Sequence, residues 1–221
     1  MKIGTDGVLL GAWASVYQAH RILDIGTGTG VIALMLAQRQ PLAQIDAIEI
    51  NFLAFSQATQ NALISPWSDR VKIKHSAIQQ FIKQPFIQPY DLIVSNPPYF
   101  KTGTISKNQT RNNVRHTTTL SHEDLLNAVQ YLLALNGRFC VILPHQEGID
   151  FEALALTYQL YCTKKIAVKG RKQKPIERWL LQFERHPKSP ETGELVIQKG
   201  KERHDYTLDY IKLTKDFYLF M

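Results

Sequence analysis

The stretch Arg21-Ile-Leu-Asp-Ile-Gly-Thr-Gly-Thr-Gly-Val-Ile-Ala-Leu-Met-Leu-Ala37 decides the fold that we predict for this 221-residue chain. Its first apolar run, residues 22–25, is short and rich in β-branched side chains, which is typical of a buried strand. Gly26, Gly28 and Gly30 follow, and an apolar helix is predicted from 31 to 39. Glycines allow a tight turn and let a ligand approach the backbone where a helix begins. The stretch therefore predicts an α/β fold with a ligand site after its first strand.

Two carboxylates beside this loop indicate the kind of ligand. The second predicted strand, 44–48, leads into Glu49, which lies 21 residues beyond Gly28 and can accept hydrogen bonds from ribose hydroxyls. Asp24 precedes the loop and would repel a pyrophosphate, whereas it can bind an amino group. The GxGxG spacing also differs from the dinucleotide pattern GxGxxG. We therefore expect S-adenosylmethionine, rather than NAD, as the cofactor.

A second motif, Asn96-Pro97-Pro98-Tyr99, follows the fourth predicted strand, 90–94. Each proline fixes φ near about −65° and lacks an N–H group, so the turn is rigid and rich in acceptors. The Asn96 side-chain oxygen and the Pro97 carbonyl can accept both hydrogens of a planar amine, and Tyr99 can stack on the attached ring. We predict that these four residues form the catalytic pocket. A simple strand-ending turn is the alternative, because Asn-Pro and Pro-Pro are common in turns.

Further cofactor contacts are expected at two other places. Thr5 and Asp6 lie where a helix is predicted to begin, at about residue 8, and could cap it or present amides to an anion. After the third predicted strand, 71–74, Ala77 stands where such sheets often present an acid to the adenine amine. The backbone amides of Ala77 and Ile78 can still contact that ring. The predicted cofactor-binding residues are Thr5, Asp6, Asp24, Gly26, Thr27, Gly28, Gly30, Glu49, Ala77, Ile78 and Asn96.

The formal net charge of +7 is unevenly distributed along the chain. Residues 1–160 carry 12 Lys+Arg against 11 Asp+Glu, whereas residues 161–221 carry 14 against 8. Basic segments beside a pocket suit a polyanion such as nucleic acid, although a solvated basic surface explains the tail equally well. The predicted RNA-binding residues are Lys101, Lys107, Arg111, Arg115 and His116 after the proline motif, and Lys169, Arg171, Lys172 and Lys174 in a hairpin.

Composition limits the class of protein. Hydrophobic content of 44% and charged content of 20% are typical of a globular chain. We expect a cytoplasmic protein without membrane contact, because no apolar stretch could span a bilayer and no signal peptide precedes the first motif. Cys140 and Cys162 lie in apolar runs without CxxC spacing, so we expect buried thiols and no bound metal. A monomer or weak dimer is expected.

The remaining elements complete the predicted sheet. A helix is expected at 51–63, and another from 121 to a turn at 136–137, before a strand at 138–143. Strands at 160–168 and 176–183 should form an antiparallel pair, and a short strand at 195–198 lies in the tail. One domain is predicted over 1–221. It includes a basic substrate loop at 100–118, the basic hairpin at 169–175 and a C-terminal extension at 186–221.

These repeated β–α units resemble the class I methyltransferase architecture: a Rossmann-like, seven-stranded, mostly parallel sheet with an antiparallel final strand and helices on both faces. The chain is also similar, over essentially its whole length, to the bacterial tRNA1(Val) adenine-37 N6-methyltransferase family. The segments that carry this resemblance are Lys2-Ile-Gly-Thr-Asp-Gly-Val-Leu-Leu-Gly-Ala-Trp13, 24–30, 96–99, Arg115-His-Thr117, Leu120-Ser-His-Glu123 and Lys215-Asp-Phe-Tyr-Leu219. Members of that family usually have a short segment before the first of these motifs, so we expect an upstream segment to be missing.

The resemblance implies transfer of a methyl group from S-adenosylmethionine to N6 of an adenine in the anticodon loop of a valine tRNA. Asn96 and Pro97 would orient the amine, and Tyr99 would stack on the base. Other functions stay open: another N6-adenine or N2-guanine RNA methyltransferase, a protein glutamine N5-methyltransferase, or a non-catalytic RNA-binding protein. The glutamine-directed enzymes carry an extra N-terminal helical domain. The intact glycine loop and Glu49 argue against a non-catalytic protein.

Overall fold

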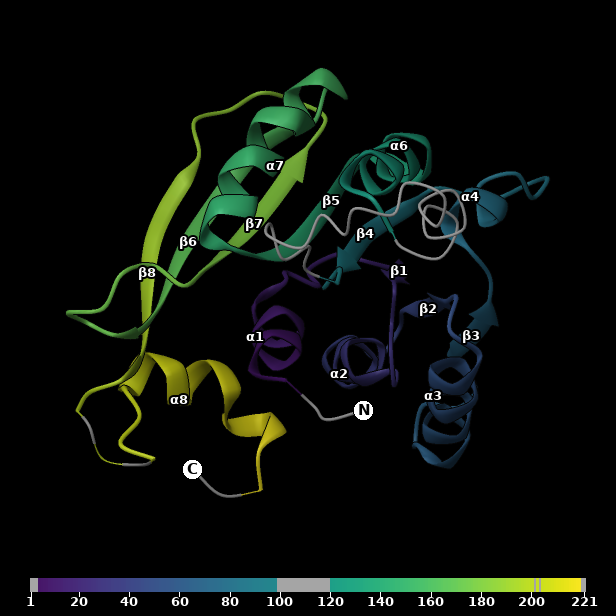
Figure 1. Cartoon of the computed structure of the whole chain (residues 1–221). Helices are drawn as coiled ribbons and strands as arrows, with labels where there is room; N and C mark the ends of the chain where they lie inside the picture. Colours follow the sequence, from purple (N-terminus) through teal and green to yellow (C-terminus); the bar gives the residue numbers. More distant parts are fainter. Residues whose placement is uncertain (1–3, 99–119, 201, 203, 220–221) are drawn as a thin grey trace, which may run out of the picture.

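A twisted sheet forms the centre of the computed structural model, which describes residues 4–98, 120–200, 202 and 204–219 (Figure 1). In these ranges the sheet has eight strands in the order β3-β2-β1-β4-β5-β7-β6-β8. The strands are β1 (Arg21–Ile25), β2 (Gln44–Glu49), β3 (Val71–His75), β4 (Tyr90–Ser95), β5 (Leu133–Pro144), β6 (Tyr161–Arg171), β7 (Arg178–Glu184) and β8 (Glu191–Gln198). Within the described ranges, β7 alone runs opposite to the others.

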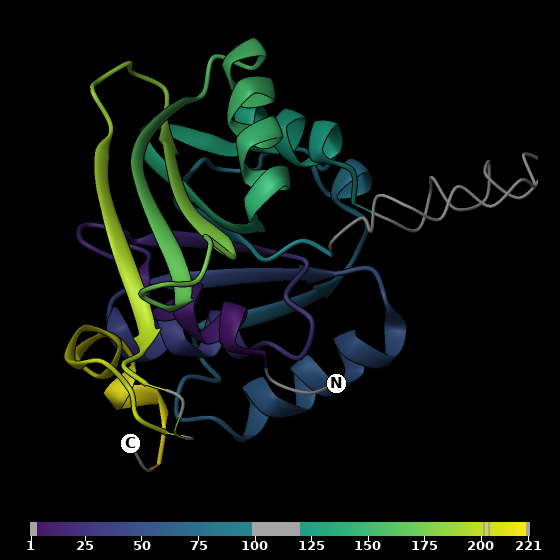
Figure 2. The same cartoon turned by 60° about the vertical axis from the view of Figure 1, so that its left-hand side comes forward.

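Helices cover both faces of this sheet. They are α1 (Thr5–Trp13), α2 (Val31–Arg39), α3 (Phe52–Ile64), α4 (Ile78–Phe81), α6 (His122–Leu132), α7 (His145–Thr157) and α8 (Leu208–Thr214), which continues into the 3-10 turn η2 (Lys215–Phe217). The first three lie on one face, and α4, α6 and α7 lie on the other (Figure 1). Figure 2 shows that β6, β7 and β8 are strongly twisted relative to β1, β2, β3 and β4. None of the helices in the described ranges is long and apolar enough to cross a bilayer.

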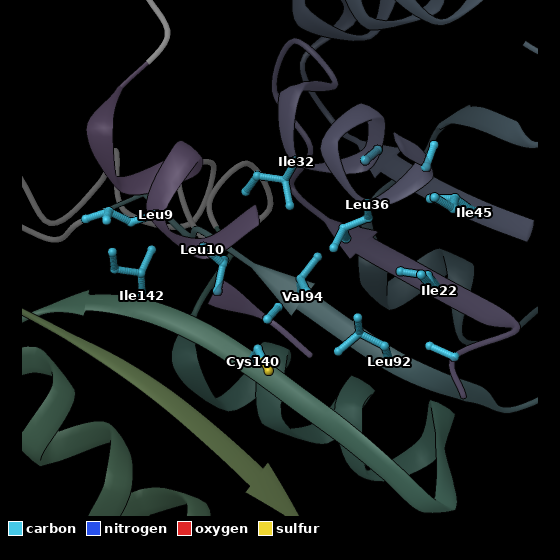
Figure 3. Close-up of a cluster of buried hydrophobic side chains, with 14 of the residues drawn as sticks. Leu9, Leu10, Ile22, Ile32, Leu36, Ile45, Leu92, Val94, Cys140 and Ile142 are labelled. Atoms are coloured by element: carbon cyan, nitrogen blue, oxygen red, sulfur yellow. The ribbon is translucent and has the colours of Figure 1, made fainter. Parts of the chain in front are cut away.

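The central strands are apolar at nearly every position because both of their faces are buried. Alternate side chains enter different clusters: Ile22 and Leu92 face α1 and α2, whereas Leu23 and Ile93 face α6 and α7. Figure 3 shows the first cluster, where side chains from α1 and α2 meet those of the strands. Burying a large aliphatic side chain stabilises the fold by about 1.5–3 kcal/mol, so this packing fixes the strand ends that carry the motifs.

The predicted α/β sheet with helices on both faces is confirmed, but its strand count of seven is wrong. The tail strand is longer than predicted and pairs in parallel with β6 as β8, which adds an eighth strand. The antiparallel pairing of β6 with β7 is as predicted. A hydrophobic pattern shows that an extended segment exists, but it does not show which sheet edge the segment joins.

Two predicted boundaries are also wrong. Helix α1 begins at Thr5 rather than at residue 8, with Gly4 in an extended conformation before it. The segment 136–137 is part of β5 instead of a turn. The register between β4 and β5 shifts between Tyr90 and Leu92, and a Cβ on Gly137 would lie 2.8 Å from the Tyr90 carbonyl oxygen. This glycine therefore allows a close approach of two backbones.

Candidate active site

The glycine loop after β1 adopts a conformation that favours glycine. Gly26, Gly28 and Gly30 have φ values of 73°, 60° and 85°, in the left-handed region. The backbone amides of Gly26 and Thr27 both donate to the Ile48 carbonyl at 3.0 Å, which attaches the loop to the end of β2. Among the residues that the structure describes, no atom lies within 4 Å of a Cβ built on Gly26. The loop is therefore a preformed cradle for a ligand at the start of α2.

Glu49, at the end of β2, is held by two backbone amides. Its Oε2 accepts from the Gly28 amide and its Oε1 from the Asn51 amide, each at 2.8 Å. The side chain is 8% exposed. Because each carboxylate oxygen can accept more than one hydrogen bond, capacity remains for ligand hydroxyls. Glu49 thus both shapes the glycine loop and offers acceptors beside it.

Asp24 is completely buried below the loop. Its Oδ2 accepts from the Thr27 hydroxyl at 2.6 Å, whereas its Oδ1 has no partner of normal geometry among the described residues. Burial raises the pKa of Asp24 to about 7, and the Glu49 carboxylate adds to the rise, while the Thr27 hydroxyl and the Ala33 amide oppose it. A buried carboxyl oxygen that lacks a partner is expected to meet a polar group of a ligand. An amino group suits this position.

A shallow, mostly apolar cleft opens next to the loop. It is lined by Ile25, Gly26, Ile48, Ile50, Ser76, Ala77, Ile78, Gln79 and Leu120. Ala77 and Ile78, predicted from the sequence, are therefore brought together with the glycine loop. Ile50 and Leu120 were missed, because a single apolar residue outside a periodic pattern carries no sequence signal. The cleft has the composition expected for a flat, partly apolar ring such as adenine.

The proline motif lies directly beside the cofactor loop. Ile25 is paired with Ser95 across β1 and β4, and the Ser95 hydroxyl donates to the Ile25 carbonyl at 2.9 Å. The next residues, Gly26 and Asn96, therefore leave adjacent strands at the same level. Asn96 is partly exposed, Pro97 is buried and Pro98 is exposed. Tyr99 lies outside the described residues.

The first turn of α1 lies close to Asn96 of the proline motif. The Asp6 carboxylate accepts from Arg178 Nε at 3.0 Å, which ties α1 to the start of β7. Thr5 is exposed and lines a groove with Val31 and Leu34 of α2. A cofactor contact by either residue stays a prediction. Sequence reasoning missed Arg178, because an ion pair spanning 172 positions leaves no local pattern.

Another pair at this edge was also missed. His122 Nε2 lies 3.9 Å from Glu147 Oε2, at the starts of α6 and α7. Burial lowers the pKa of His122 and raises the pKa of Glu147. Each shift is in the direction of the neutral form of its group, and its cause is the loss of solvent around the side chain. It comes together through helix packing, which single-sequence periodicity does not predict.

The basic hairpin lies at the same edge of the sheet as the proline motif. Pro144, at the carboxyl end of β5, pairs with Arg178, at the start of β7, so the turn between β6 and β7 continues beyond this edge. Lys172 and Lys174 are exposed, whereas Lys169 pairs with Glu194 at 2.6 Å and Arg171 is partly buried. The other predicted RNA-binding residues, Lys101, Lys107, Arg111, Arg115 and His116, lie outside the described residues.

The cysteines are free thiols with no metal cluster around them in the described ranges, where no group of three or more His, Cys, Asp or Glu could hold an ion. Cys140 is buried, but Cys162 is partly exposed, so the prediction of two buried thiols is wrong for the second. Burial raises the pKa of both thiols to about 12, which makes them unreactive.

Solved structures of other proteins share this fold. A predicted O-methyltransferase from Agrobacterium tumefaciens matches with a TM-score of 0.73 at 16% identity, covering 96% of each chain. TrmK from M. capricolum, solved in complex with the cofactor product S-adenosyl-homocysteine, matches with a TM-score of 0.56 at 11% identity, over 87% of this chain and 71% of that one. The fold is therefore the one that these methyltransferase structures have.

Sequence relatives narrow this class. The family model described as methyltransferase small domain matches residues 4–149. A relative from Flavobacterium johnsoniae, 47% identical over 100% of this chain and 94% of its own length, is named tRNA1(Val) (adenine(37)-N6)-methyltransferase. So is one from Serratia proteamaculans, 45% identical over 100% of this chain and 84% of its own length. This chain belongs to that family, as predicted, and its cofactor is S-adenosylmethionine.

Proposed function

We propose that this protein transfers a methyl group from S-adenosylmethionine to N6 of adenine 37 in tRNA1(Val). One observation carries the proposal. The ends of β1 and β4 are paired, so the glycine loop and Asn96 begin side by side at the same edge of the sheet. A cofactor cradled by the loop and an amine held at Asn96 would therefore be neighbours. The names of the relatives supply the substrate.

Each residue around the loop has a distinct task toward the cofactor. Glu49 would accept hydrogen bonds from the ribose hydroxyls, Asp24 would bind the amino group, and the cleft at Ala77 and Ile78 would hold the adenine ring. The bound cofactor supplies an electrophilic methyl group on a sulfonium. The protein contributes mainly position, because correct orientation alone can lower a barrier by several kcal/mol, up to about 10.

Asn96 and Pro97 act on the acceptor. The Asn96 side-chain oxygen and the Pro97 carbonyl would each accept one N6 hydrogen of the adenine, which turns the nitrogen lone pair toward the donor. A base in a loop costs less to extrude than one in a duplex, which suits an anticodon-loop substrate. After transfer the alkylated nitrogen is acidic, so its proton can leave to water without a strong base. Tyr99 would stack on the extruded base.

The basic hairpin would bind the tRNA backbone. Lys172 and Lys174 are exposed at the edge where Asn96 lies, and no ion pair involves either of them within the described part of the chain. Phosphates are bound by such lysines as point charges, with an affinity that falls with salt. The anticodon stem flanking the target base is the segment that we assign to this hairpin.

Transfer assays with two transcripts test the proposal. A tRNA1(Val) transcript with adenine at position 37 should accept methyl, and the same transcript with guanine there should not. Asn96→Ala should lower the transfer rate by about 10²–10³, the typical loss when one positioned hydrogen-bond partner is removed. Its affinity for S-adenosylhomocysteine should stay within about threefold of wild type. Asn127→Ala makes the same change on an exposed face of α6 and serves as the control.

Two results would count against this assignment. Equal methylation of the guanine transcript would remove both the N6 target and the role of Asn96. Transfer by Asn96→Ala at the rate of Asn127→Ala would leave the substrate assignment in place but remove Asn96 from the pocket.

A further inference from the structure

Two glycines of α1, one turn apart, have different surroundings. A Cβ on Gly11 would lie 2.8 Å from Met35 Sδ and 3.3 Å from Met35 Cβ, so the close packing of α1 on α2 accounts for this glycine. A Cβ on Gly7 would have as its nearest neighbours Ile32 Cγ1 at 3.8 Å and Asn96 Nδ2 at 4.0 Å, which is ordinary contact. Packing against the described protein atoms therefore does not require a glycine at position 7.

The neighbours of Gly7 show where its missing side chain would point. Ile32 is in the first turn of α2, directly after the glycine loop, and Asn96 follows β4. Gly7 is partly exposed, so the described part of the protein does not close this side. Its open face thus lies at the junction between the cofactor loop and the acceptor motif. That is where a methyl donor and a methyl acceptor have to meet.

Helix α1 is held beside this junction by contacts at both of its ends. Asp6 pairs with Arg178 at 3.0 Å in the first turn. At the other end, Arg39 Nη1 donates to the carbonyls of Gly11 and Ala14, both at 2.7 Å. Leu9 and Leu10 are 1% and 0% exposed in the core, where Figure 3 shows them facing the strands. A side chain added at position 7 would therefore occupy the junction.

We propose that Gly7 is a specificity-determining residue, whose missing side chain leaves room beside Asn96 for the amino edge of the target adenine. This inference rests on the proposed function, because it takes Asn96 as the acceptor of the amine. Alanine is the better helix former, and no clash with protein atoms excludes it at this position. The glycine is therefore explained by the substrate rather than by the fold.

Gly7→Ala and Gly7→Ser test the inference, with Gly4→Ala as the matched control. Gly4 precedes α1 in an extended conformation, and no atom of the described residues lies within 4 Å of a Cβ built there, so the control adds the same methyl group without a described contact. Both Gly7 variants should keep the wild-type melting temperature or exceed it. They should bind S-adenosylhomocysteine within about threefold of wild type by calorimetry, because neither variant alters Asp24, Glu49 or the glycine loop. Their kcat on tRNA should fall by at least about tenfold, whereas Gly4→Ala should transfer normally.

Three outcomes would overturn the inference. Wild-type kcat in both Gly7 variants would show that the junction tolerates a side chain. A loss of S-adenosylhomocysteine affinity in parallel with kcat would assign Gly7 to the cofactor site instead. A melting temperature far below that of Gly4→Ala would make Gly7 a packing glycine. Asn96→Ala, assayed in parallel, separates the proposed role of Gly7 from the proposed role of Asn96. Full activity of Asn96→Ala would refute the role of Asn96 in binding the amine, whatever the Gly7 variants do.

Discussion

The substitution Asp24→Asn tests whether burial of a carboxylate destabilises the cofactor site. Asp24 is the acid near the glycine loop whose pKa is shifted most. Asp24 is completely buried, with one oxygen bound to the Thr27 hydroxyl and the other without a partner of normal geometry in the described ranges. Burial raises its pKa from 3.8 to about 7. Asparagine keeps the shape of the side chain and cannot ionise. The comparison therefore isolates the cost of the charge.

The sign of the effect follows from the direction of the shift. Between its unfolded and folded pKa values, Asp24 binds more protons in the native state, so the wild-type protein loses stability as pH rises. Below pH 3.8 both states are protonated and the penalty vanishes; above pH 7 it is complete. The shift corresponds to about 4 kcal/mol in full, of which about 2–3 kcal/mol develops between pH 5 and pH 8.

Urea unfolding of the cofactor-free protein at several pH values measures this difference. The free energy of unfolding of Asp24→Asn, minus that of wild type, should increase by about 2–3 kcal/mol from pH 5 to pH 8. Any constant effect of the amide, such as an unfavourable contact with the Ala33 amide, cancels in the comparison across pH. Glu49 is the charged group that faces Asp24, and it is unchanged in both proteins.

A difference that is the same at every pH would refute the reasoning. It would mean that Asp24 is ionised in the native state throughout this range, and that water or a group outside the described residues satisfies it. A pKa lowered by folding would give the same flat result, because Asp24 would then be ionised in both states above pH 5.

Two further predictions concern neighbouring parts of the site. Glu49→Gln should weaken S-adenosylhomocysteine binding by about 1–3 kcal/mol in calorimetry, because an amide NH2 then faces the Gly28 or Asn51 amide; unchanged affinity would remove Glu49 from the site. Lys172→Gln combined with Lys174→Gln should flatten the dependence of log Kd for tRNA on log salt by about one to two units. The control combines Lys72→Gln with Lys83→Gln, which changes two exposed lysines remote from the hairpin. If both double variants had the same salt dependence, the hairpin would be an ordinary solvated surface without a role in tRNA binding.

The parts of the fold that the sequence predicts are those controlled by local chemistry. The strand, glycine loop and helix at 21–39 follow from apolar runs and from glycines that favour positive φ, and all are found. Asn51 caps α3, as a polar residue at a helix start is expected to do. Ser121 caps α6 in the same way. These signals depend on residues within a few positions of one another.

What the sequence does not predict depends on contacts between distant segments. The sequence predicts a turn at 136–137. In the structure Gly137 allows β5 to approach the Tyr90 backbone closely, and this contact is visible only once β4 and β5 are paired. Arg178 lies in the predicted strand 176–183 with no sign of a role at the site, whereas in the structure it binds Asp6 near the start of the chain. Gly7 reads as part of a polar turn before a helix. Its position beside Asn96 appears only when α1 is packed.

The candidate site combines features that each reduce the stability of the cofactor-free protein. Asp24 is buried without a full set of partners among the described residues, and folding fixes three loop glycines, which lose more conformational entropy than other residues. Such features persist where the surrounding structure determines them strongly, as the packing of α1 and the strands does here. A ligand that brings an amino group to Asp24 and hydroxyls to Glu49 satisfies both groups at once. Cofactor binding should therefore be coupled to the folding free energy of this half of the sheet, because the ligand removes costs that the unbound native state bears.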